Sequence, residues 1–387
     1  MRMGKRSSVR VLGWAGLALV MLGAVSVTAM ALTAGHGKVP PPKPLAVALH
    51  DAATAAPPAG VTAHFAVHQH LIPGSSNLLS SGPLAGATGT VWAAGNKVRV
   101  SVHSQLGSSQ LAYDGTSVTF YNPKNHAAYR LAVPPHTRDS ETSSSARQAP
   151  PSVADISKLL TGIGKDAVLS GAIPGNVAGR PAYTVQVRSR HASGLVGSLA
   201  LAWDAARGVP LRFAITPRGS STPALELVVT DIHFGKLSAG ATSLTLPAGT
   251  HTEALQLPSK HQVQGAAKHV HSVSGAGAVA RAVQFHLAAP ATLADRPRAE
   301  VRSLGDGALI VYGKGLDSLL VYEKRAGGHA AAATLPVMSP VSVNGAPGHE
   351  LETTLGSVLQ FSKGGVTYTV AGFQTADTIL SAAQSLH

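Results

Sequence analysis

Residues 110–122 read QLAYDGTSVTFYN and give the clearest indication of the fold. Asp114-Gly115 lies between two runs in which apolar and polar residues alternate, and this dipeptide is typical of a tight β-hairpin turn. Alternation with a period of two predicts strands with one buried face. Similar runs, separated by turn signals, cover residues 61–71, 88–94, 97–104 and 127–133. The first part of the body is therefore predicted to be an antiparallel meander.

A short helix is predicted to interrupt the meander at residues 152–163, because Ser152 is a good N-cap and Asp155 follows three positions later. Strands are expected again at residues 182–189, 197–204, 209–216 and 223–234. Residues 258–278 lack periodicity and are interpreted as a linker. The predicted fold class is α+β, mostly antiparallel β, and residues 279–387 form a small α+β domain of their own. Its expected elements are a terminal helix at 375–386 and strands at 283–287, 299–304, 308–313, 319–324, 356–363 and 366–373.

The N-terminus has the charge pattern of an export segment. Four cationic residues lie within the first ten, and no charge interrupts residues 11–35. Residues 1–34 are therefore predicted to be either a cleaved signal peptide or a transmembrane anchor, and the sequence leaves both open. Residues 35–60 are rich in proline and are interpreted as a linker that holds the body away from the membrane. In both cases the body is expected outside the cytoplasm.

Composition excludes several classes of protein. The chain has no cysteine, which excludes a disulfide scaffold, a thiol enzyme and Cys-ligated zinc. The formal net charge of +13 is compatible with nucleic acid or with an anionic membrane surface. The basic residues are scattered rather than clustered with stacking aromatics, so no nucleic acid is expected and a membrane surface is favoured.

No motif in the sequence indicates catalysis or a cofactor. The acidic residues stand singly at turns and strand ends, and the nucleophile elbow, the Walker loop and the zinc-protease helix are absent. His64, His68 and His70 fall on the polar face of the first strand, without acidic ligands nearby, so no metal is expected there. The chain is predicted not to be an enzyme. A hydrolase stays open as a minor alternative, because catalytic triads are assembled in space.

The order of the pieces resembles the LolA/LolB lipoprotein-carrier superfamily over residues 61–257. That family opens with a strand, a "G-x-hydrophobic" strand and a basic "K-x-R" strand, and a hairpin with Asp-Gly at its turn follows. The corresponding residues here are Gly89–Trp92, Lys97–Val102 and Leu111–Tyr121. In the second half Asp204, Pro210, Asp231 and Phe234 occupy the matching positions. The resemblance implies an incomplete β-barrel wrapped around an apolar cavity, partly closed by short helices.

A second domain behind a linker makes the whole plan similar to MucB/RseB-type regulators of anti-sigma factors. The expected function is non-covalent binding of a lipid or lipoprotein acyl chain in the half-barrel cavity, next to a membrane. The alternative is an envelope-stress sensor that binds a membrane signalling protein through the C-terminal domain. The candidate ligand residues are the apolar strand positions expected on the concave face, namely Phe65, Val67, Val100, Val102, Tyr113, Phe120, Val185, Val187, Leu201, Phe213 and Ile215.

Overall fold

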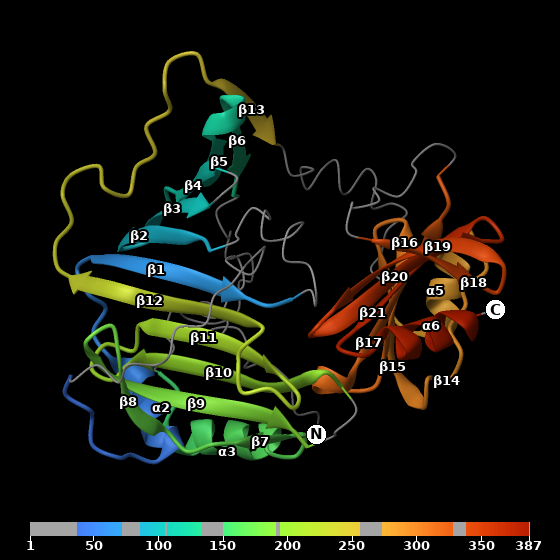
Figure 1. Cartoon of the computed structure of the whole chain (residues 1–387), viewed down its shortest axis with the longest axis horizontal. Helices are drawn as coiled ribbons and strands as arrows, with labels where there is room; N and C mark the ends of the chain where they lie inside the picture. The colour runs from blue at the N-terminus through green and yellow to red at the C-terminus, as the bar shows by residue number, and fades with distance from the viewer. Residues whose placement is uncertain are drawn as a thin grey trace, which may run out of the picture.

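In the residues that the structure describes, the chain forms two β-sheets, one of 13 strands and one of eight. Figure 1 shows them as two separate sheets. The computed structural model describes residues 37–71, 86–104, 107–133, 150–190, 194–255, 273–327 and 338–386. The predicted signal peptide or anchor, residues 1–34, lies outside the described residues. We call the larger sheet with helices α2 and α3 the N-terminal unit. The smaller sheet with helices α5 and α6 is the C-terminal unit.

The N-terminal unit is an antiparallel meander that returns to its first strand. Its strand order is β13-β6-β5-β4-β3-β2-β1-β12-β11-β10-β9-β7, and β8 also pairs with β9. The only parallel pair among these described strands is β13 with β6. The elements are α2 (Leu45–Thr54), β1 (Val61–Gln69), β2 (Thr88–Ala94), β3 (Lys97–Ser104), β4 (Gly107–Tyr113), β5 (Ser117–Asn122), the 3₁₀ turn η1 (Pro123–Asn125), β6 (Ala127–Ala132), α3 (Val153–Ile163), β7 (Ala167–Leu169), β8 (Ile173–Val177), β9 (Arg180–Ser189), β10 (Val196–Asp204), β11 (Pro210–Pro217), β12 (Leu225–Phe234) and β13 (His251–Leu255).

The C-terminal unit is an antiparallel sheet with helices packed on one face. Its strand order is β14-β15-β16-β17-β21-β20-β19-β18. Buried residues of α5 and α6 join one core with the inward side chains of the strands. The elements are α5 (Ala276–Ala282), β14 (Thr292–Leu293), β15 (Arg296–Leu304), β16 (Gly307–Tyr312), the 3₁₀ turn η2 (Gly315–Asp317), β17 (Leu319–Arg325), β18 (Ser339–Val343), β19 (Ala346–Thr353), β20 (Gly356–Lys363), β21 (Val366–Gly372) and α6 (Ala376–Gln384).

The predicted fold class is confirmed: the chain is α+β, mostly antiparallel, with a curled half-barrel sheet. The hairpin at Asp114-Gly115 joins β4 to β5. Asp114 Oδ1 accepts hydrogen bonds from the amides of Thr116 and Ser117 at 2.8 and 2.7 Å. The hydrogen bond that the Ser117 hydroxyl donates to Asp114, together with those from the two amides, holds the pKa of Asp114 well below its usual value. Helix α3 also begins as predicted, because the Ser152 side chain accepts the Asp155 amide.

The predicted strand at residues 283–287 is wrong. Helix α5 ends just before it, and the Val283 amide still donates to the Val279 carbonyl oxygen. The segment then packs against the C-terminal core without a neighbouring strand, and the Ala288 amide donates to the Glu323 carboxylate at 2.9 Å. A buried side chain therefore takes the place of the β-partner. A second difference is that residues 45–54, inside the proline-rich stretch, form helix α2.

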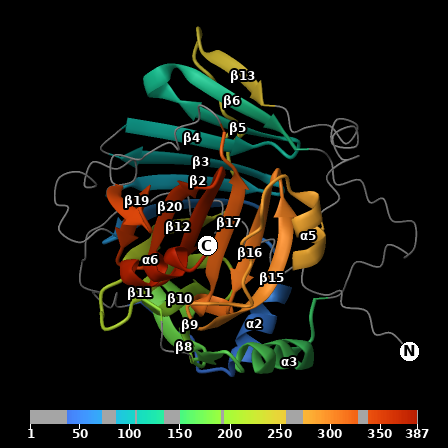
Figure 2. The ribbon, with the colours of Figure 1, turned by 90° about the vertical axis from the view of Figure 1, so that its right-hand side faces the viewer.

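The two units touch each other directly. Figure 2 shows the C-terminal unit in front of the N-terminal sheet, so that it covers part of one face. Leu355 and Leu316 of the C-terminal unit pack in a hydrophobic cluster with Phe65 and Val100 of the N-terminal sheet. We call the face of the sheet that carries Phe65 the inner face.

Candidate functional site

All eleven candidate ligand residues lie on the inner face. Residues that pair directly across antiparallel strands point to the same side of a sheet, so the register decides the face. Phe65 pairs with Gly89, and Gly89 pairs with Val102, so these residues share one face. The pairing of β3 with β4 and of β4 with β5 extends the same face to Phe120. On the other side of β1, residues paired across β12, β11, β10 and β9 also share this face, which therefore includes Leu201 and Val185. The structure therefore brings together residues from both halves of the sheet.

The inner face has three different surroundings. Its centre is a hydrophobic cluster in which the candidates Phe65, Val67, Val100 and Ile215 are buried, and the candidates Val102 and Phe213 pack against it. Helix α2 covers a second region, where Ala48 packs against Val185, Tyr183 and Trp203. On either side of the centre, apolar side chains stay open to solvent: Phe120 on β5 is 38% exposed, and Leu201 on β10 is 36% exposed. Tyr113 and Val187 are half-buried.

The centre of the inner face is filled by the other unit, which sequence reasoning missed. Leu355 lies in the turn between β19 and β20 and is only 6% exposed. It packs in the cluster of Phe65 and Val67, and Leu316 of η2 packs against the same cluster. No local pattern around Leu355 distinguishes it from any leucine beside a hairpin turn. Contact of the eleven residues with a ligand stays a prediction.

Backbone hydrogen bonds fix the contact between the units. The Thr354 amide donates to the Leu71 carbonyl oxygen at 2.6 Å, and the Thr354 hydroxyl donates to the His70 carbonyl oxygen at 2.7 Å. A third bond joins the Leu195 amide to the Phe373 carbonyl oxygen at 2.7 Å. Three turns at one end of the C-terminal unit, those of Leu316, Leu355 and Phe373, therefore meet the N-terminal unit.

Gly89 is expected to be essential for the packing of the inner face. A Cβ at this position would overlap the Phe65 ring and the Ser101 carbonyl oxygen. We therefore expect Gly89→Ala to destabilise the N-terminal unit by about 2 kcal/mol, because neither neighbour has room to move. Urea unfolding followed by tryptophan fluorescence reports on this unit, since Trp14, Trp92 and Trp203 all precede the C-terminal unit.

Gly175 in β8 provides the control, because nothing lies within 4 Å of a Cβ placed there. Gly175→Ala should leave the urea midpoint nearly unchanged. Phe65→Leu should recover part of the stability lost in Gly89→Ala, since it removes the ring that the new methyl group meets. Equal midpoints for the two alanine variants would contradict this account of the inner face.

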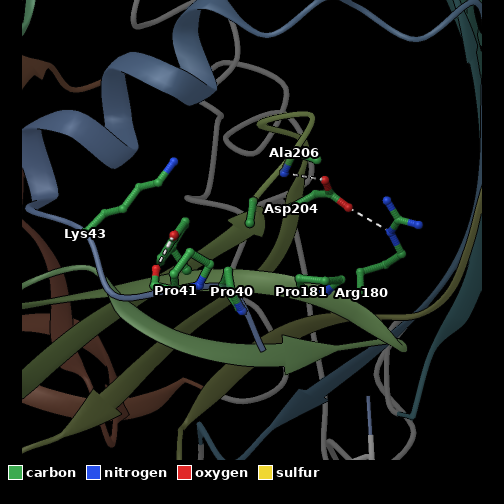
Figure 3. A pocket seen from close by; sticks show the side chains of 9 residues that line it. Pro40, Pro41, Lys43, Arg180, Pro181, Asp204 and Ala206 are labelled. Carbon is green, nitrogen blue, oxygen red and sulfur yellow. Dashed lines mark hydrogen bonds and ion pairs between the residues drawn. The ribbon is translucent and has the colours of Figure 1, made fainter. Parts of the chain in front are cut away.

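A pocket of about 180 Å³ lies where residues 40–43 cross β9 and β10 (Figure 3). Its walls include Pro40, Pro41 and Tyr183, and the Tyr183 hydroxyl donates to the Pro41 carbonyl oxygen at 2.6 Å. Lys43 pairs with Asp51 at 2.6 Å, a hydrogen bond that raises the pKa of this lysine. Both cations of the pocket, Lys43 and Arg180, are paired with carboxylates. The hydrogen bond between Tyr183 and Pro41 therefore holds residues 40–43 against the sheet beside this pocket.

Residues singled out by the resemblance have structural roles near this pocket. Asp204 pairs with Arg180 at 2.8 Å and its other oxygen accepts the amides of Ala206 and Arg207. The guanidinium groups of Arg180 and Arg207 both lie over the Phe234 ring, at 5.0 and 4.7 Å from its centre. These contacts join β9, the β10–β11 turn and β12. They stabilise the half-barrel.

The histidines of the first strand lie where the alternation places them. His64 Nδ1 is 3.0 Å from the Thr90 hydroxyl, on the face opposite to Phe65. Among the described residues no group of three or more His, Asp and Glu side chains is arranged to hold a metal ion. In the part of the chain that the structure describes, no helix has the length and apolar character needed to cross a bilayer.

Comparison with known proteins finds similarity at the level of structure. No family model matches the sequence, and no curated protein matches it. Similar solved structures include the Pseudomonas aeruginosa MucA/MucB complex, with 15% identity and a TM-score of 0.40 over 88% of this chain and 96% of that chain. MucB in complex with MucA(peri) has 16% identity and a TM-score of 0.39, covering 87% and 94% of the two chains. An uncharacterized conserved protein from Thermus thermophilus has 12% identity and a TM-score of 0.33, over 54% and 98%. These similarities are too distant to place the chain in a family.

Proposed function

We propose that the N-terminal unit binds an acyl chain of a lipid or lipoprotein non-covalently on its inner face, outside the cytoplasm and without catalysing a reaction. The observation that carries the proposal is the apolar inner face, to which all eleven candidate residues belong. Part of this face is open, because Phe120, Leu201 and Tyr129 are each more than a third exposed. Exposed large apolar side chains on one face are typical of a surface that binds another apolar group.

The mechanism is burial of apolar surface. Each methylene of an acyl chain that leaves water contributes about 0.8 kcal/mol, so a chain of ordinary length supplies enough free energy for stable binding. Phe120 and Tyr129 pair across β5 and β6 and form an aromatic edge of the open region. The headgroup stays at the rim, where polar and basic side chains hold it.

Native mass spectrometry of the protein purified from the cell envelope tests this proposal. We expect an adduct of lipid mass that is lost on denaturation. Phe120→Asp should remove the adduct, because it places a charge in the acyl site. Thr119→Asp is the matched control, since Thr119 is adjacent but points to the opposite face. A clean apo mass, both as purified and after incubation with mixed phospholipid vesicles, would overturn the proposal.

A second candidate function is regulation of a membrane signalling protein. The observation that favours it is Leu320, which is 42% exposed on β17 between the buried Leu319 and Val321. It lies on the face of the C-terminal sheet that α5 and α6 leave uncovered. A photo-crosslinking residue at Leu320 in growing cells should capture one membrane protein, while the same residue at His64 should not. No specific product from Leu320 would argue against this role.

A further inference from the structure

The turn of residues 353–356, which carries Leu355 and which we call the knob, is shaped by hydrogen bonds within the C-terminal unit. The Thr353 hydroxyl oxygen accepts hydrogen bonds from the Leu355 and Gly356 amides at 3.2 and 3.1 Å. The same hydroxyl donates to the Gly356 carbonyl oxygen at 2.7 Å. These bonds lie within the turn and fix its shape without help from the N-terminal unit. The backbone at Leu355 is therefore held in this conformation by bonds of the C-terminal unit alone.

The knob packs on the surface where the acyl chain is expected. Leu355 belongs to the same buried cluster as four of the eleven candidate residues, among them Phe65, Val67 and Val100, and two further candidates pack against this cluster. Its neighbour Thr354 bonds to His70 and Leu71, which directly follow the strand that carries Phe65. The packing of Leu355 and the hydrogen bonds of Thr354 thus both hold the knob at the end of β1.

We propose that Leu355 occupies part of the acyl-chain site, so that binding of the acyl chain and docking of the C-terminal unit exclude each other. This inference rests on the proposed function of the inner face. A ligand that fits only the undocked state shifts the equilibrium toward that state, and the two processes oppose each other to the same extent. Lipid binding would thereby release the three turns of the C-terminal unit from the half-barrel.

The burial of Leu355 gives the direction of the coupling. Leu355 is almost completely buried at the interface, whereas an acyl chain has more methylenes than one leucine side chain and buries more apolar surface. The ligand therefore displaces the knob, at the cost of the docking free energy. Weakening the knob removes this cost, so the apparent affinity for the acyl chain rises.

Leu355→Ser in the full chain tests the proposal, with pyrene-labelled palmitic acid as the probe. We expect the variant to bind the probe about tenfold more tightly than the wild type, because most of the apolar docking contact is lost. Leu304→Ser is the matched control, since Leu304 is 50% exposed and absent from the interface cluster. It lies at the opposite end of the strands from Leu316, and its variant should bind with wild-type affinity.

Hydrogen exchange measures the contact between the two units directly, without using the fluorescence of the probe. The amides of Leu195 and Thr354 donate across the interface, so their hydrogen exchange should speed up when palmitic acid is added. Thr354→Val, which removes only the hydroxyl bond to His70, should tighten probe binding by a smaller factor than Leu355→Ser. This variant keeps Leu355, so a folding defect caused by replacing that leucine cannot explain its effect on binding.

The outcomes separate the two proposals. If the wild type binds the probe and Leu355→Ser binds with the same affinity, the exclusion is wrong and the acyl-binding function stands. Unchanged exchange at Leu195 and Thr354 at saturating probe would lead to the same conclusion. If neither protein binds the probe, the acyl-binding function itself is wrong, and the exclusion fails with it.

Discussion

Replacing Asp204 by alanine should destabilise the N-terminal unit by about 3 kcal/mol. The carboxylate is 1% exposed and satisfies three donors, the Arg180 side chain and the backbone amides of Ala206 and Arg207. Alanine leaves both amides without their acceptor and the guanidinium without its counter-charge. Because Arg180 is one-third exposed, water recovers part of its solvation, and the loss stays below that of a fully buried pair.

Two further variants separate the contributions of this carboxylate. Asp204→Asn keeps an oxygen for the two amides and removes the charge, so it should cost less than half as much as alanine. Asp231→Ala provides the control, because Asp231 is half exposed and its ion pair is with the exposed His233, a contact that contributes little to stability. Urea midpoints from tryptophan fluorescence give all three values. A midpoint for Asp204→Ala within error of Asp231→Ala would show that the carboxylate does not hold the sheet together.

Elements whose cause is local were predictable from the sequence. The Asp114-Gly115 turn and the start of α3 depend on side chains that bond to amides two or three residues away, and both are confirmed. The alternation of apolar residues also placed all eleven candidates on one face. This is possible because the side-chain period of a strand is two, so parity alone decides the face.

Features whose cause is non-local were missed. Strand β13 pairs in parallel with β6, which precedes it by more than a hundred residues, and nothing in HTEAL itself marks a strand. Helix α2 is stabilised by packing of Ala48 on Tyr183 and Trp203, not by its proline-rich surroundings. The occupation of the inner face by Leu355 has the same origin. A sequence indicates that a side chain will be buried but not which distant segment buries it.

Glu323 should make the stability of the C-terminal unit fall as the pH rises. The side chain is fully buried on β17, and among the described residues its Oε1 has no hydrogen-bond partner. Burial raises the pKa of this carboxyl from 4.5 to about 7, against the opposing effect of the Ala288 amide. Between these two values the folded state binds more protons than the unfolded state, so unfolding is favoured progressively as the pH increases. Above pH 7 the loss amounts to about 3 kcal/mol.

Glu323→Gln isolates this effect, because the amide oxygen still accepts the Ala288 hydrogen bond and the side chain stays neutral. The variant should be more stable than the wild type at pH 8, by up to about 3 kcal/mol, and nearly equal to it at pH 4. Hydrogen exchange of the β16 and β17 amides measures this unit separately, since it has no tryptophan. Burial and the Glu323 charge also raise the pKa of the neighbouring Tyr312, to about 12, and that of Tyr368, so neither phenol titrates in this range. A stability difference that is the same at both pH values would mean that the Glu323 carboxyl is not the titrating group.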